Sequence, residues 1–351
     1  YTSPHLIDFR ERMRVNGTPA SKEYVTDFVE KHRAFFEPLQ PSFFELTTAM
    51  AFNYFAEQNV DVAIIEVGLG GRLDCTNIIT PELCIITNIS PDHTQFLGNT
   101  LQEIASEKAG IIKNGIPVVI GETTTETKEV FAHKAKESNA PIIFAEEEAL
   151  LTAATPMEYG YRYSSTVFGE FCGELGGDYQ QKNTNTLLSA INILRGKGFT
   201  ITEESLRKGF TNVCKLTGLM GRWQKIQENP RVICDAGHNI GGIKYITEQL
   251  ARVDCRELRV VFGMVNDKDI TSVLKMMPKN AEYYFTQASI KRAMPADDLK
   301  NMAERFGLMG NSHPNVKEAL EAALSDSSDD DFIFVGGSCF IVADLLVALK
   351  K

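Results

Sequence analysis

Short apolar runs alternate with amphipathic segments along most of the chain. Such runs predict buried strands, and in the first half they occur at 60–67, 83–89, 117–120 and 141–145. Between or before them, apolar residues recur with the period of a helix at 23–36, 45–58, 101–113 and 125–137. This alternation predicts a parallel sheet covered by helices.

The pattern changes near residue 151 and then returns. Residues 151–177 carry short, polar, aromatic-rich runs with glycine turns, which predict an antiparallel appendage, and helices are expected at 183–196 and 203–213. Residues 215–221 contain two glycines and show no periodicity, so they are the candidate linker. The strand–helix alternation then restarts, with strands near 231–234, 258–262, 282–286 and 332–335 and helices near 244–252, 270–277, 296–306, 316–324 and 340–349.

We therefore expect two α/β domains, because 351 residues exceed what one hydrophobic core usually serves. Residues 1–216 would form a central domain with a mostly parallel sheet and the small antiparallel appendage. Residues 217–351 would form a smaller, Rossmann-like, doubly wound domain. The acidic run at 325–331 is most simply a solvated loop.

Composition and charge narrow the classes of function. The chain is 43% hydrophobic and 23% charged, and its formal net charge of -10 argues against nucleic acid as the main partner. An anionic substrate stays open, because a local basic pocket can form in an acidic protein. No apolar run approaches the ~18 residues of a membrane span, so no membrane partner is expected. Seven scattered cysteines without a CxxC pair favour a reducing, cytoplasmic location and argue against a cysteine-bound zinc ion.

The stretch IIEVGLGGRLDCTN places an acid and a glycine-rich loop after an apolar run. In one interpretation, Glu66 begins a surface turn and the glycines only reverse the chain. In the other, Glu66 holds a metal ion beyond the carboxyl end of its strand, where open α/β sheets bind ligands. His93 follows the next strand, and a carboxylate with an imidazole suits Mg²⁺ or a similar divalent ion. A capping or core histidine is the alternative for His93.

Lys108 lies in the apolar stripe of the next expected helix. Thr100 and Glu103 form a capping box, and Ile104, Lys108 and Ile112 follow at helical spacing. Burial of an ammonium group is costly, so the pKa of Lys108 is expected to fall. The alternative is a lysine whose head group reaches water. A neutral amine there can also take up carbon dioxide as a carbamate, which is a long carboxylate able to bind a metal.

In the second half, the stretch ICDAGHNIGG leads from a strand into a helix. Asp235 and His238 stand at the strand end, and the N-terminus of the helix favours an anion. The fingerprint G-x-G-x-x-G is absent from both glycine loops, which weakens a nicotinamide-cofactor interpretation. Arg222 lies at the expected domain junction, where it is either a solvated charge or a clamp for a phosphate.

Several independent stretches resemble folylpolyglutamate synthase and dihydrofolate synthase of the Mur ligase superfamily, and the match runs almost end to end. They are YTSPHL with ERMRVNG, PSFFELTTAMAF, EVGLGGRLDCTN, ISPDHTQFLGNTLQEIASEKAGIIK, GRWQ, DAGHNIGG, GMVNDKD and VGGSCFIV. The resemblance implies a Mur-ligase-like central domain of the P-loop type and an ATP-dependent amide ligase. ATP would phosphorylate a carboxylate of dihydropteroate or a reduced folate. The amine of L-glutamate would then attack the acyl phosphate, and ADP and phosphate would leave.

The resemblance also assigns roles to residues. Glu66 and His93 would ligate Mg²⁺, and Lys108 would bind a second Mg²⁺ as a carbamate. Contacts with ATP are implied for Arg222, Asp235, His238 and Asn183. A border to the pterin site is implied for Ser42, Phe44, Asp74 and Cys75, and a contact on the glutamate side for Ser338. Relatives suggest a monomer, and ligands from two domains imply that closure assembles the site.

The chain departs from the family pattern in places. The family carries a P-loop close to G-T-N-G-K-G-S before the TSPH segment, and this sequence begins in mid-motif. We therefore expect a fragment without the first strand, P-loop and first helix, which would expose apolar sheet edges, bind ATP poorly and catalyse little. Tyr179 stands where the family more often has His, and Cys75 where it usually has Ala. The fine shape of the nucleotide and pterin sites is therefore in question.

Other functions stay open at this point. One is a non-catalytic folate- or nucleotide-binding homologue, which an upstream P-loop in frame would exclude. Another is a cell-wall Mur-type ligase, against which the FFE segment and the GLGGRLD loop argue. A nicotinamide dehydrogenase is the least favoured. The sequence does not decide between dihydropteroate and reduced folates as acceptors.

Overall fold

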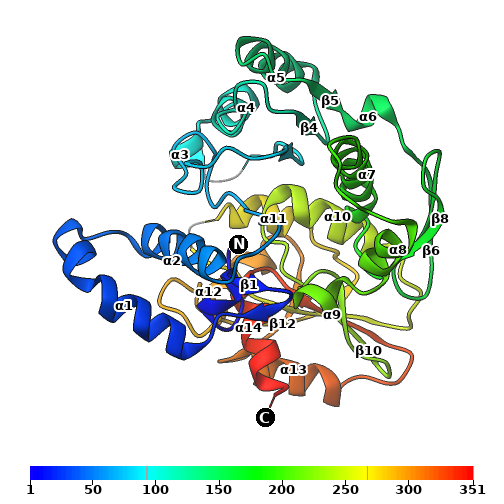
Figure 1. Cartoon of the computed structure of the whole chain (residues 1–351). Coiled ribbons are helices and arrows are strands. Elements are labelled where there is room, and N and C mark those ends of the chain that lie inside the picture. Colours follow the sequence, from blue (N-terminus) through cyan, green and yellow to red (C-terminus); the bar gives the residue numbers. More distant parts are fainter. Residues whose placement is uncertain (92–93, 267, 351) are drawn as a thin grey trace.

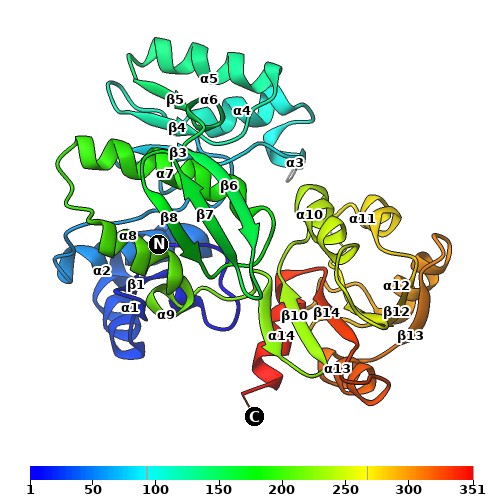
Figure 2. The same ribbon diagram turned by 90° about the vertical axis from the view of Figure 1, so that its right-hand side faces the viewer.

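The computed structural model describes residues 1–91, 94–266 and 268–350 (Figure 1). Figure 2 shows a lobe built on a six-stranded sheet beside a larger part that carries the remaining sheets. The expected α/β class with a parallel sheet, an antiparallel appendage and a Rossmann-like C-terminal part is confirmed. In this described part of the chain, no helix combines the length and apolarity that a membrane crossing requires.

The N-terminal residues form a helical unit. Its elements are η1 (Phe9–Arg12), β1 (Arg14–Val15), β2 (Thr18–Pro19), α1 (Lys22–Phe36), η2 (Glu37–Leu39) and α2 (Phe43–Glu57). The hydroxyls of Ser21 and Ser42 each accept an N–H group from the first turn of α1 and α2, from Tyr24 and Glu45, which fixes where both helices begin. A small core that includes Met13, Phe28 and Tyr54 joins the two helices.

The strand expected at 60–67 is wrong. Tyr1 contacts the segment: its amino group donates to the Ile64 carbonyl at 2.7 Å, and the Glu66 N–H donates to the Tyr1 carbonyl at 2.9 Å. One flanking residue does not make a ladder, and the three-stranded sheet ends at β3 (Cys84–Ile86). Val62 and Ile64 are consequently 58% and 81% exposed. An apolar run indicates that a segment could form a buried strand. It does not show whether a partner strand is present to pair with it.

The central sheet is parallel, with the order β3-β4-β5, where β4 is Val118–Ile120 and β5 is Ile142–Phe144. Helices α4 (Leu101–Ala109) and α5 (Thr125–Glu137) pack on one face through a core that includes Ala105 and Phe131. Helix α7 (Gln180–Gly196) covers the other face, where Ala190 contacts Val119 and Ala145. The short helix α3 (Thr94–Leu97) contacts α4, and the short helix α6 (Ala145–Glu148) contacts α7.

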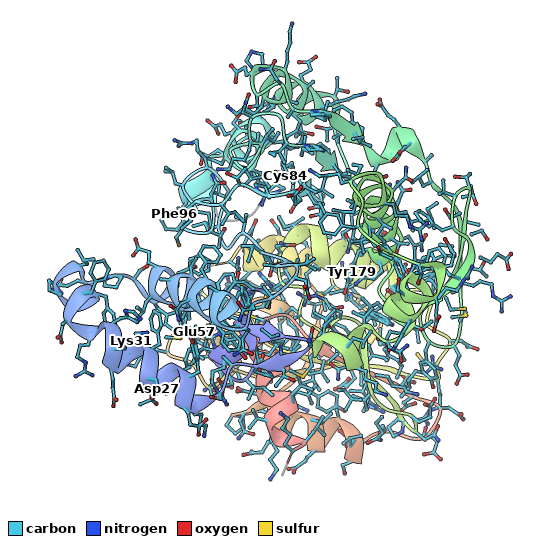
Figure 3. The ribbon with its side chains drawn as sticks, viewed as in Figure 1. Asp27, Lys31, Glu57, Cys84, Phe96 and Tyr179 are labelled. Atoms are coloured by element: carbon cyan, nitrogen blue, oxygen red, sulfur yellow. The ribbon has the colours of Figure 1, made fainter. Side chains whose placement is uncertain are left out.

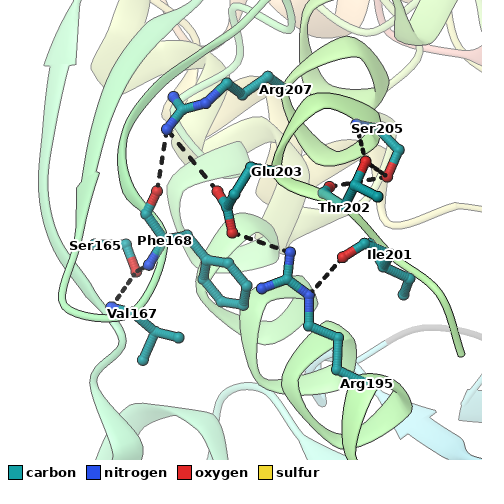
Figure 4. A network of polar contacts seen from close by, with 9 residues as sticks. All are labelled: Ser165, Val167, Phe168, Arg195, Ile201, Thr202, Glu203, Ser205 and Arg207. Carbon is teal, nitrogen blue, oxygen red and sulfur yellow. Dashed lines mark hydrogen bonds and ion pairs between the residues drawn. The ribbon is translucent and has the colours of Figure 1, made fainter. Parts of the chain in front are cut away.

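The appendage is an antiparallel meander of β6 (Leu151–Pro156), β7 (Tyr161–Ser165) and β8 (Gly169–Gly173). Helix α8 (Glu203–Thr211) follows α7 and shares a core with α7 and β8, and the short helix α9 (Val213–Thr217) contacts α8. Figure 4 shows how polar contacts fix α8: Glu203 lies between Arg195 at 3.1 Å and Arg207 at 3.9 Å. The Arg195 guanidinium also lies over the Phe168 ring. The candidate linker at 215–221 overlaps the end of α9, and a domain division near residue 216 stays a prediction.

The C-terminal sheet has the order β13-β12-β11-β14-β10-β9 and is parallel except for β9. Its strands are β9 (Gln224–Gln227), β10 (Arg231–Asp235), β11 (Leu258–Phe262), β12 (Ala281–Phe285), β13 (Met309–Ser312) and β14 (Phe332–Gly336). One face is covered by α10 (Ile240–Leu250), α11 (Ile270–Met276) and α12 (Ala296–Glu304), and the other by α13 (Val316–Ser325) and α14 (Cys339–Ala348). Edge strands β9 and β13 lacked an apolar signal because each has polar residues and only half-buried or exposed positions.

Candidate active site

Asp74 organises the glycine-rich loop that follows Glu66. Its Oδ2 accepts the N–H groups of Gly68 at 3.0 Å and Leu69 at 2.9 Å. Its Oδ1 accepts the N–H of Thr76 at 2.9 Å and also the Thr76 hydroxyl. Because the residue is only 8% exposed, this carboxylate shapes the loop from within.

The loop rests on the last turn of α4, which carries Lys108. The Arg72 N–H donates to the Glu107 carbonyl at 2.8 Å, and the two side chains form an ion pair at 2.8 Å. A Cβ on Gly71 would lie 2.8 Å from the Glu107 carbonyl oxygen and 3.0 Å from that of Lys108. Glycine is therefore required for this approach. Lys108 is half-buried, so the structure places it beside the loop but not in the apolar core.

The start of α2 reaches the same loop. Ser42 caps α2: its hydroxyl accepts the Glu45 N–H at 3.2 Å, and Glu45 accepts the Ser42 N–H at 2.7 Å. Two residues on, the ring of Phe44 covers Gly68, and a Cβ there would lie 2.1 Å from its Cζ. Cys75 is half-buried nearby, with its sulfur 3.9 Å from the Thr48 hydroxyl, and desolvation raises the pKa of its thiol. The structure thus brings Phe44, Asp74 and Cys75 together around one loop.

Glu66 is exposed, and its Oε2 accepts the Ser3 N–H at 2.7 Å. Desolvation raises the pKa of this carboxyl group, while the Ser3 hydrogen bond and then the charge of Arg222 act to lower it. Arg222 belongs to the C-terminal lobe, and its positive charge is close enough to act on the Glu66 carboxyl group. Glu66 offers a hard oxygen donor of the kind that Mg²⁺ prefers.

A cation–π group beside the loop escaped the sequence analysis. Arg12 is 9% exposed, and its guanidinium lies 5.3 Å and 5.8 Å from the ring centres of Phe43 and Phe44. Its Nε donates to His5 Nδ1 at 3.0 Å, and desolvation lowers the pKa of His5. Arg12 is far from Phe43 and Phe44 in the sequence, so the sequence alone does not predict that they are in contact.

In the C-terminal lobe, β10 and β14 end side by side, with Asp235 opposite Gly336. Ser338 is 2% exposed and caps α14, since its hydroxyl accepts the Ile341 N–H at 3.2 Å. His238 begins the turn into α10, and its Nδ1 lies 3.0 Å from the Ala236 carbonyl oxygen. A carbonyl oxygen only accepts, so Nδ1 carries the proton and donates.

Arg222 lies in the turn before β9 and donates to the Gly221 carbonyl at 3.3 Å. Asn183 lies in α7, where its amide donates to Gln180 at 3.1 Å. It is four residues beyond Tyr179 and so lies on the same face of the helix. Tyr179 contacts Asp235, which brings α7 to the end of β10.

His93 lies outside the described residues, as does its neighbour Asp92. Within 1–91, 94–266 and 268–350, no group of three or more His, Cys, Asp or Glu side chains is placed to hold a metal ion. The metal set expected from the sequence, Glu66 with His93 and a modified Lys108, stays a prediction.

Family models match both parts of the chain. The Mur ligase middle domain matches residues 24–184, and the glutamate ligase domain of Mur ligases matches residues 221–339. The fold, the loop on α4 and these two matches define the protein as a Mur ligase, an ATP-dependent acid–amino-acid ligase.

The dihydrofolate synthase/folylpolyglutamate synthase of Bacillus subtilis (strain 168) is 33% identical over 367 residues, covering 100% of this chain and 83% of that protein. Its counterpart in Escherichia coli (strain K12) is 31% identical over 353 residues, covering 99% of this chain and 78% of that protein. Within the Mur ligases, the chain therefore belongs to the folylpolyglutamate synthase/dihydrofolate synthase family.

Solved structures agree. E. coli FolC in complex with DHPP and ADP superimposes with a TM-score of 0.84 at 29% identity, covering 100% of this chain and 81% of that chain. The bifunctional enzyme from Yersinia pestis, complexed with AMPPNP and Mn ion, superimposes with a TM-score of 0.84 at 28% identity, covering 100% of this chain and 82% of that chain. These relatives bind a nucleotide and, in the second case, a divalent metal.

Proposed function

We propose that the protein joins L-glutamate to dihydropteroate, to a reduced folate, or to both. ATP would convert a carboxylate of the acceptor to an acyl phosphate, and the glutamate amine would displace the phosphate. The observation that carries this proposal is the meeting of two lobes at one loop. Glu66 and the turn bearing Lys108 come from the central part, and Arg222 from the C-terminal lobe lies within electrostatic reach of Glu66.

In this proposal, Glu66, His93 and Lys108, the last as a carbamate, hold Mg²⁺. The ion would neutralise charge on the transferring phosphoryl group. Arg222 would add positive charge from the second lobe, and His238 and Asn183 would contact the nucleotide. Ser338 would lie on the glutamate side, at the ends of β10 and β14.

The acceptor would bind at the loop between Phe44 and Cys75. An aromatic face and half-buried apolar surface suit a flat pterin ring. The carboxylate of Asp74 is already surrounded by four donors from its own loop, so it would shape this surface from behind. Ser42 would set the start of α2 and thereby the place of the Phe44 ring. We further propose a cytoplasmic monomer.

Glutamate-dependent release of ADP tests the proposal, with dihydropteroate or tetrahydrofolate as acceptor and an amino-sugar peptide of the cell wall as the comparison. Turnover with a pteridine acceptor and none with the amino-sugar peptide is expected. Turnover with the amino-sugar peptide alone would instead indicate a cell-wall ligase. Binding of a folate without turnover would favour a non-catalytic role.

A further inference from the structure

We propose that Tyr179 is a positioning residue for the ligase reaction: through Asp235 and the backbone of Trp223, it fixes the turn that presents Arg222. The inference rests on the proposed function for the role of Arg222, but its geometry stands on contacts between the two lobes. Figure 3 labels Tyr179 near the middle of the molecule, beside α10.

Asp235 is the centre of the relay. The Tyr179 hydroxyl donates to its Oδ2 at 2.8 Å, and the Trp223 N–H donates to the same oxygen at 2.7 Å. The Gly237 N–H donates to Oδ1 at 2.7 Å. Asp235 is only 2% exposed, so water cannot readily replace a donor that is lost. One carboxylate therefore joins the start of α7 to the turn before β9.

The turn that Asp235 holds is a strained one. Trp223 has a φ of +45°, in the left-handed region that bulky side chains rarely adopt. Further bonds close the turn: Gly221 N–H donates to Gln224 at 2.7 Å, and Ala236 N–H donates to the Gly221 carbonyl at 2.9 Å. Arg222 stands between Gly221 and Trp223, so the backbone bonds on both sides set its direction.

The loop that carries Tyr179 is itself fastened to α10 of the other lobe. The Asp178 N–H donates to the Gln249 side chain at 3.0 Å, and the Gln249 amide donates to the Gly176 carbonyl at 2.8 Å. Arg252 forms an ion pair with Asp178. Tyr179 therefore approaches Asp235 from a fixed position, and Asn183 lies on the same face of α7 one turn later. The relay therefore links Arg222 and Asn183, two of the residues proposed to act on the nucleotide.

Tyr179→Phe removes one hydroxyl and leaves the ring, and Tyr24→Phe is the matched control. The half-buried Tyr24 donates to the Met50 carbonyl at 2.8 Å within the N-terminal unit, far from the relay in sequence. Trp223 is the only tryptophan in the chain, so tryptophan fluorescence reports on the surroundings of this one residue. We expect acrylamide to quench Trp223 more strongly in Tyr179→Phe, with no change in Tyr24→Phe.

In the enzyme that turns over, Tyr179→Phe is expected to lower kcat/KM for ATP about tenfold, the usual effect of losing one hydrogen bond to a charged group. The change should fall on KM for ATP more than on KM for glutamate. Unchanged quenching together with an unchanged KM for ATP would overturn the inference. If Tyr179 had a merely structural role, Tyr179→Phe would lower the Tm, as Tyr24→Phe would, without changing the quenching of Trp223 or KM for ATP.

Two safeguards separate the possible failures. Fluorescence needs no turnover, so a wild-type protein that is silent in the assay contradicts the proposed function and leaves the relay to be judged by quenching. If Tyr179→Phe does not fold, Gln249→Ala loosens the loop 176–179 without touching the relay itself. That variant is expected to raise the quenching of Trp223, and unchanged quenching in it would count against the relay.

Discussion

The ring of Phe44 lies directly against Gly68, so closely that a Cβ on Gly68 would meet its Cζ at 2.1 Å and its Cε2 at 2.5 Å. Because Gly68 has no Cβ, the aromatic ring of Phe44 from α2 can cover the backbone of the loop. The ring cannot retreat freely, because Tyr1 packs edge-on against it at 6.0 Å between centroids. The shape of the proposed acceptor site depends on this pair.

Gly68→Ala is therefore expected to push Phe44 or the loop aside. The overpacking should reduce the free energy of unfolding by about 1–3 kcal/mol and raise KM for the pteridine acceptor. Gly209→Ala in α8 is the control, because a Cβ there meets nothing within 4 Å. Urea unfolding should show that variant to be unchanged or more stable by up to about 1 kcal/mol. If Gly68→Ala were as stable as Gly209→Ala and kept the wild-type KM, the Phe44 ring would be able to move away from the added Cβ without cost.

Asp74→Asn tests whether the loop is held from within. The amide nitrogen would face N–H donors, and at least one buried group would lose its acceptor, at a cost of about 1–3 kcal/mol. We expect lower stability and faster hydrogen exchange at the Gly68 and Leu69 amides. Asp61→Asn, at an exposed position, is the control and should leave both quantities unchanged. Protection of those two amides in Asp74→Asn would argue against the organising role.

Lys108→Met tests the proposed metal site. Removal of the amine should abolish glutamate-dependent ADP release, while the circular dichroism spectrum and Tm stay near those of the wild type because the side chain is only half-buried. Lys136→Met, an exposed lysine of α5, should retain full activity. If Lys108 acts as a carbamate, mass spectrometry of the native protein in bicarbonate should show the added carbon dioxide. Normal turnover by Lys108→Met would remove this residue from the mechanism.

The surroundings of Asp331 predict how the free energy of unfolding depends on pH. It is 2% exposed and accepts from Arg256 at 2.9 Å and Arg259 at 3.1 Å, and the hydrogen bond from Arg256 is the main cause that lowers the pKa of its carboxyl group. A folded-state pKa below the unfolded value of about 3.9 means that its stabilisation is complete above that pH. The stabilisation is lost as the pH falls from there through the folded-state pKa.

Asp331→Asn should therefore lower the free energy of unfolding by about 2 kcal/mol at pH 7, by analogy with other hydrogen bonds to charged groups. The deficit relative to the wild type should shrink as the pH falls below about 4. Asp330→Asn, at the exposed neighbouring residue, is the control. Denaturant titrations at several pH values measure both effects, and a deficit of the same size at every pH would contradict the assignment.

The sequence predicted the bounds of a helix or strand well where a single apolar pattern covers the whole element. The strand expected at 258–262 is β11, and the helix expected at 125–137 is α5, residue for residue. β11 is buried along its whole length between two neighbouring strands, and α5 buries one face at helical spacing. The run at 60–67 has the same apolar composition but no ladder, since burial of a strand depends on partners that its own residues do not specify.

The candidate site shows the same limit. Phe44, Asp74 and Cys75 were predicted to border one site, and the loop brings them together, although their roles stay predictions. The acidic run at 325–331 was expected to be solvated, yet Asp331 is buried because two arginines from β11 and the preceding loop converge on it. Likewise, nothing in the pattern around Tyr179 signals a bond to Asp235, which lies 56 residues away. Such pairings arise only when separate elements meet.

The central claim is that this chain carries the machinery of an ATP-dependent glutamate ligase. The most direct measurement is glutamate-dependent ADP release with dihydropteroate and with tetrahydrofolate. It should be made on a form of the protein that carries a P-loop. We predict turnover with at least one of the two acceptors. A P-loop-bearing chain that is silent with both acceptors would contradict the account.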